Sequence, residues 1–171
     1  NIDDWIVLLK KHKDPSAFLI KLISLLQLLP HSADTILLWR ELIRMARQLG
    51  PANNMPSPIT TNSWKVLGEA LCQLSPQMAH EPIHDLIFNL DPYYEAVVML
   101  PSLLSIFPTA DITIQAWLAE LVAEQGEGYP EEIRTELLPH IVQFFSVLGY
   151  PQTAERWIRY ADNPHTSYWV K

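Results

Sequence analysis

Apolar residues recur along this chain at the three- and four-residue spacing that places side chains on one face of an α-helix. The clearest stripes are Leu38, Leu42, Met45 and Leu49; Trp64, Leu67, Leu71 and Leu74; and Ile114, Trp117, Leu118, Leu121 and Val122. Five glycines against fourteen prolines, together with many leucines, favour short helices separated by prolines over a sheet. The pattern therefore predicts an all-α fold.

The ends of several helices can be placed from local residue chemistry. Asp14 is expected to cap one helix with Pro15 in its first position, and Ser32 or Asp34 is expected to cap the next. Pro101 is expected to break or kink the helix that contains it, because proline lacks an N–H group and crowds the preceding turn.

Two segments of the chain resemble each other, residues 14–50 and residues 91–126. Each begins with Asp-Pro, passes Ser-Leu-Leu, Pro, Ala-Asp and Trp in that order, and ends at Gly, with an offset of 77 or 78 residues. Such self-similarity is typical of stacked helical units. The predicted units are a leading helix 2–13, hairpins at about 14–50, 62–90, 91–126 and 130–162, and a tail 163–171.

The predicted architecture is an array of antiparallel helical hairpins resembling an α-solenoid, with a compact multi-helix bundle as the alternative. The mean step of about 39 residues suits two-helix repeats. The segment 50–61 contains three prolines and no helical period, so it is expected to be a loop.

The last predicted hairpin resembles a tetratricopeptide (TPR) repeat. Its small and large apolar residues fall near the positions of that family: Leu138, Ile141, Val142, Phe145, Gly149, Ala154, Ile158 and Ala161. The resemblance, which extends in general to TPR- and HEAT-like α-solenoids, implies a concave peptide-binding groove. The family's Trp-Leu-Gly-Tyr signature is absent, so no binding residue is carried over.

Composition and charge narrow the functional classes. The length of 171 residues suits one domain. Hydrophobic residues make up 49% of the chain and charged residues only 18%, and this surplus of hydrophobic residues predicts a surface that contacts a partner, a second copy or flanking repeats. The chain is therefore expected to be a domain of a larger protein. Its net charge is −7, and residues 66–133 hold eleven acids but no Lys or Arg, which disfavours nucleic acid as a partner.

The remaining composition predicts a cytoplasmic protein. One cysteine cannot form an internal disulfide framework and fits a reducing compartment. No run reaches the ~18 apolar residues of a membrane span, and the amphipathic N-terminal segment lacks the apolar core of a signal peptide. Cys72 lies among apolar residues and is expected to be an inert thiol.

One motif has the letters of a zinc-protease site, His80-Glu81-Pro82-Ile83-His84. The chemistry needs both histidines on one continuous helix, with the glutamate beside a metal-bound water. Pro82 is expected to interrupt that helix by beginning a new one, and no third ligand is evident nearby. A zinc hydrolase using this motif is therefore a disfavoured alternative to two surface histidines, and no cofactor or catalytic residue is predicted.

The best polar candidate is a stripe of Arg40, Arg44 and Arg47 on one helix face. It is either a solvated face or a site for an acidic peptide or an acidic surface on another copy. Trp169, near the chain end, is a candidate interface anchor. The predicted function is a non-enzymatic interaction, scaffold or adaptor module that binds a protein or peptide, with a regulatory helical domain beside a catalytic domain as the alternative.

Overall fold

The computed structural model describes residues 14–49 and 59–162, and every regular element in these two ranges is a helix. The prediction of an all-α fold is therefore confirmed. The expected leading helix 2–13, the tail 163–171 with Trp169, and most of the expected loop 50–61 lie outside the described residues. No helix in the described ranges is long and apolar enough to cross a membrane.

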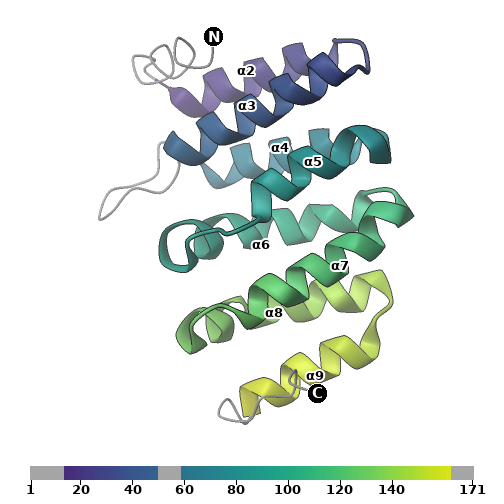
Figure 1. Cartoon of the computed structure of the whole chain (residues 1–171). Coiled ribbons are helices and arrows are strands. Elements are labelled where there is room, and N and C mark those ends of the chain that lie inside the picture. Colours follow the sequence, from purple (N-terminus) through teal and green to yellow (C-terminus); the bar gives the residue numbers. More distant parts are fainter. Residues whose placement is uncertain (1–13, 50–58, 163–171) are drawn as a thin grey trace.

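The helices stack in two rows (Figure 1). One row consists of α2 (Pro15–Gln27), α4 (Thr61–Cys72), α6 (Val97–Ile106) and α8 (Glu131–Leu148), each packed against the next. The second row consists of α3 (Ala33–Leu49), α5 (Pro76–Ile87) and α7 (Ile112–Glu127). The last helix, α9 (Pro151–Asp162), packs mainly against α8. A π-helical turn, η1 (Pro92–Ala96), leads into α6, and a 3₁₀ turn, η2 (Phe107–Thr109), follows it.

Short polar side chains cap the starts of four helical elements, α2, α3, η1 and α7. The Asp14 carboxylate accepts the Ala17 N–H at 3.1 Å with Pro15 in the first turn, as predicted. Ser32 is the residue that accepts a helix N–H at the start of α3. Asp91 and Asp111 cap η1 and α7 in the same way. Each carboxylate or hydroxyl satisfies a backbone donor that has no intrahelical partner.

The prediction that Pro82 begins a new helix is wrong, and Pro101 does not break the helix that contains it. Pro82 lies inside α5 and Pro101 inside α6, and both helices continue past them. In α5, Pro82 is itself buried between the fully buried Ile83 and the buried Ala79. Burying an aliphatic side chain of this size stabilises by about 2 kcal/mol, so a few such contacts offset the roughly 3 kcal/mol cost of an internal proline.

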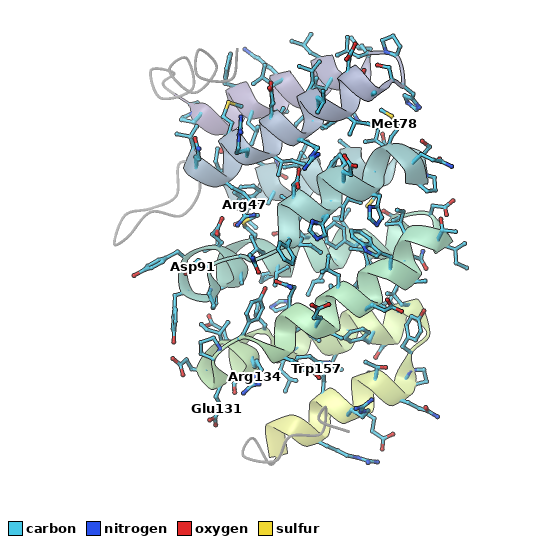
Figure 2. The ribbon with its side chains drawn as sticks, viewed as in Figure 1. Arg47, Met78, Asp91, Glu131, Arg134 and Trp157 are labelled. Atoms are coloured by element: carbon cyan, nitrogen blue, oxygen red, sulfur yellow. The ribbon has the colours of Figure 1, made fainter. Side chains whose placement is uncertain are left out.

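One continuous hydrophobic core joins the helices of both rows. Its largest fully buried side chains are Trp39, Trp64, Trp157, Phe107, Phe144 and Phe145. Trp157 points from α9 toward the helices above it (Figure 2). Trp117 differs from these tryptophans, because it is only partly buried at the edge of the core. Of the two tryptophans in the predicted apolar stripes, Trp64 is therefore a core residue and Trp117 reaches the surface.

Tyr129 carries a polar group into this core. It is buried, and its hydroxyl has no hydrogen-bond partner among the described residues. Burial raises the pKa of Tyr129 to about 12 from its ordinary value of 10.0. Because burial disfavours the phenolate in the folded state, titration of Tyr129 costs no stability below pH 10.0, and the free energy of unfolding falls as pH rises from 10.0 toward about 12.

Replacing Tyr129 with phenylalanine should therefore raise the free energy of unfolding by about 1 kcal/mol, because a buried hydroxyl without a partner keeps its desolvation cost. The variant should also lose less stability in alkali, since it has no phenol to ionise when unfolded. Urea unfolding at neutral and alkaline pH measures both effects. The exposed Tyr150→Phe is the control and should change neither. A clear destabilisation by Tyr129→Phe would show that the hydroxyl is satisfied after all.

Candidate interaction surface

A groove lies between α3 and α5, and we call it the α3–α5 groove. It has a volume of about 700 Å³. Its walls include the three arginines of the predicted stripe together with Leu37, His84 and Phe88. The structure thus brings Arg40, Arg44 and Arg47 to one hollow, where the sequence indicated only a shared helix face. The three guanidinium groups are, however, not equivalent.

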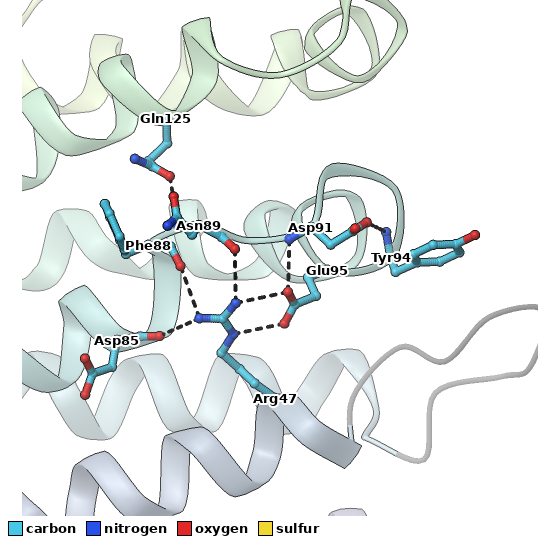
Figure 3. A network of polar contacts seen from close by, with 8 residues as sticks. All are labelled: Arg47, Asp85, Phe88, Asn89, Asp91, Tyr94, Glu95 and Gln125. Carbon is cyan, nitrogen blue, oxygen red and sulfur yellow. Dashed lines mark hydrogen bonds and ion pairs between the residues drawn. The ribbon is translucent and has the colours of Figure 1, made fainter.

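Arg47 binds backbone carbonyl groups at the C-terminal end of α5 (Figure 3). Its Nε and Nη2 donate to the two carboxylate oxygens of Glu95 at 2.9 and 3.0 Å. Its Nη1 and Nη2 also donate to the backbone carbonyls of Asp85, Phe88 and Asn89 at 2.9, 3.1 and 3.3 Å. Carbonyls at a helix C-terminus lack intrahelical donors, and a cation there complements the helix dipole. Arg47 is therefore a structural link between α3, α5 and η1.

Glu95 is held from a second side, because its Oε1 also accepts the Asp91 N–H at 2.9 Å. The side chains of Arg47 and Glu95 are only 22% and 16% exposed, so water screens their attraction weakly. Next to them, Asn89 adopts the left-handed backbone conformation with φ of 52°, and its N–H donates to Gln125 of α7 at 2.9 Å. This cluster fixes the connection from α5 into η1.

Arg40 makes a more exposed link between α3 and α5, the two helices that form the walls of the groove. Its Nε donates to Asp85 at 2.6 Å and its Nη1 to Glu81 at 3.1 Å. Hydrogen bonding to Asp85 raises the pKa of Arg40. Arg40 is 42% exposed and Glu81 58%, and exposed pairs of this kind contribute about 0–1 kcal/mol.

Of the three arginines in the stripe, Arg44 is the one that remains available to bind a partner. It is exposed, and within the described part of the chain it makes no ion pair. The acids that neutralise Arg40 and Arg47 come from α5 and η1 of the same chain. The role of the stripe in binding a partner stays a prediction, and it now depends mainly on Arg44.

Four aromatic rings lie close together beside the groove, and we call them the aromatic cluster. They are His80 and His84 of α5, Phe88, which directly follows α5, and Trp117 of α7. The ring centroids of His80 and Trp117 are 4.1 Å apart, and those of His84 and Phe88 are 4.5 Å apart. His84 also lies 6.1 Å from Trp117. Phe88 is 36% exposed, so part of the cluster faces solvent. The sequence indicated neither this contact between α5 and α7 nor the ion pairs of Arg40 and Arg47.

The two histidines of the zinc-protease-like motif do share one helix, because α5 runs through Pro82. Their rings contact Trp117 and Phe88. Among residues 14–49 and 59–162, no group of three or more His, Cys, Asp and Glu side chains is arranged to hold a metal ion. The zinc-hydrolase alternative therefore gains no support from the geometry.

Cys72 lies partly buried at the end of α4, with its Sγ 3.9 Å from the Ile106 carbonyl oxygen. Burial raises the pKa of the thiol to about 11. The nucleophilic form is the thiolate, which is scarce at neutral pH for such a group. These properties match those of an inert thiol.

Comparison of the chain with protein-family models, with curated proteins and with solved structures gives no match.

Proposed function

We propose that this chain is a non-enzymatic protein-interaction module, a scaffold or adaptor that presents the second row of helices to a protein or peptide partner. The proposal rests on one observation: a groove and exposed apolar and aromatic side chains lie together on the face formed by the second row of helices. There, the α3–α5 groove of about 700 Å³ is bordered by the exposed apolar side chains of Leu37 and Phe88 and by the aromatic cluster. Exposed apolar and aromatic groups beside a hollow are typical of protein interfaces.

We further propose that the pairs α2–α3, α4–α5, α6–α7 and α8–α9 are antiparallel hairpins of one α-solenoid-like repeat domain. The two rows and the short connections within each pair support this proposal. In such an array each hairpin packs against its neighbours, so a surface that spans α3, α5 and α7 is already ordered in the unbound protein. This lowers the entropic cost of binding. The cytoplasm remains the expected location.

Site-specific photo-crosslinking in cells tests the function. A photoreactive amino acid is placed at Leu37 or Phe88 on the proposed face, and at Thr135 on α8 as the control, since Thr135 is exposed in the other row. The proposal predicts that the first two positions crosslink a discrete protein that the control position does not. Binding of that purified protein should then weaken about tenfold or more when Leu37 is replaced with aspartate. Equal crosslinking from all three positions, or from none, would contradict the proposal.

A further inference from the structure

We propose that the partner contributes an arginine side chain, which binds where the aromatic cluster meets Glu120 and Glu124 of α7. This inference rests on the proposed function and specifies the chemistry of the partner at that face.

The aromatic part of this surface consists of exposed or partly exposed rings. His80, His84 and Phe88 follow one another at four-residue spacing, so they form one stripe along α5. Trp117 of α7 lies against both histidines and remains partly exposed. Trp is the side chain whose face attracts a cation most strongly, and the attraction grows when the cation is partly removed from water.

The charged part of the surface is negative and uncompensated. Glu120 and Glu124 follow Trp117 by three and seven residues, which places them within about 60° of it on the helix. Both are exposed, and in the described ranges neither forms an ion pair. The chain has no Lys or Arg between residues 66 and 133, and the two arginines that reach α5 and η1 from α3 are already bound to other acids.

A partner cation is therefore complementary to this surface, and arginine fits it better than lysine. The guanidinium group is planar, so it can stack on the Trp117 ring while its N–H groups donate to a carboxylate. The lysine ammonium group is a compact and strongly hydrated charge that cannot stack in this way. The sequence-based prediction of an acidic partner concerned the stripe of Arg40, Arg44 and Arg47 on α3, not this surface of α5 and α7.

Binding of three short synthetic peptides to the purified chain tests the inference by fluorescence polarisation. The peptides alternate leucine with arginine, with lysine, or with citrulline, which has nearly the shape of arginine but no charge. We expect the arginine peptide to bind about tenfold more tightly than the citrulline peptide, and more tightly than the lysine peptide. Because the lysine peptide carries the same charge, it separates stacking from general electrostatic attraction.

Matched variants test whether Trp117, Glu120 and Glu124 form the binding site. Trp117→Leu and the double variant Glu120→Gln with Glu124→Gln should each weaken the arginine peptide about tenfold. The control is Glu69→Gln with Glu136→Gln, which changes the net charge equally at exposed positions of the other row. It should leave the affinity within about twofold. Circular dichroism checks that each variant keeps its helix content.

Three results would overturn the inference: no binding of the arginine peptide, equal binding of the arginine and citrulline peptides, or an equal loss in the control variant. The proposed function is judged separately by the crosslinking from Leu37 and Phe88. A crosslinked partner whose affinity is unchanged by the Glu120 and Glu124 substitutions would refute the arginine contact and leave the interaction module standing.

Discussion

Replacing Arg47 with methionine should lower the free energy of unfolding by about 3 kcal/mol. Methionine keeps much of the side-chain volume but removes every hydrogen bond of the guanidinium group. The Glu95 carboxylate, only 16% exposed, would keep its charge without its cation, and three carbonyls at the end of α5 would lose a donor. Losing one partner of a buried pair costs more than the pair itself contributes. Urea unfolding followed by circular dichroism measures the change.

The control is Arg44→Met, the same substitution on the same helix at an exposed arginine without an ion pair among the described residues. It should change stability by no more than about 0.5 kcal/mol. Glu95→Gln in the Arg47→Met background should recover part of the loss, because the unpaired charge is then gone. Equal effects of Arg44→Met and Arg47→Met would show that the link from α3 to η1 contributes little.

Replacing Trp157 with alanine should lower the free energy of unfolding by about 4 kcal/mol. Trp157 is fully buried, and it is the largest side chain by which α9 joins the core. Its ring also lies against Gly126 of α7, where an added Cβ would come within 2.7 Å of the ring edge. The loss should therefore include helix content, because α9 depends on this contact more than on its own helix propensity. Chemical unfolding and far-ultraviolet circular dichroism measure the two effects.

The close approach of Gly126 and Trp157 provides an independent check. Gly126→Ala should destabilise the protein by about 1–3 kcal/mol, because the buried ring must move. In the Trp157→Ala background the same change should become neutral or favourable, since alanine is the better helix former. Gly128→Ala is the control, because an added Cβ there meets only the Gln125 carbonyl oxygen at 3.5 Å. If Gly126→Ala lowered the free energy of unfolding equally in both backgrounds, the contact between Gly126 and Trp157 would be disproved.

The candidate site could be predicted only in part. The sequence placed Arg40, Arg44 and Arg47 on one helix face, because helical periodicity alone decides this. It could not assign Glu81 and Asp85 to Arg40 or Glu95 to Arg47, since the partners lie more than 40 residues away and belong to other helices. For the same reason the contact of Trp117 with His80 and His84 was not foreseen.

The sequence by itself determined the all-α class and the starts of some helices, such as those at Asp14 and Ser32. These starts rest on hydrogen bonds between residues three positions apart, and such bonds form wherever the local residues permit them. Only the tertiary structure decided that α5 continues through Pro82 and that α7 includes Gly126. There, burial against neighbouring helices outweighs local preference, and in one case the Trp157 ring occupies the space beside the glycine.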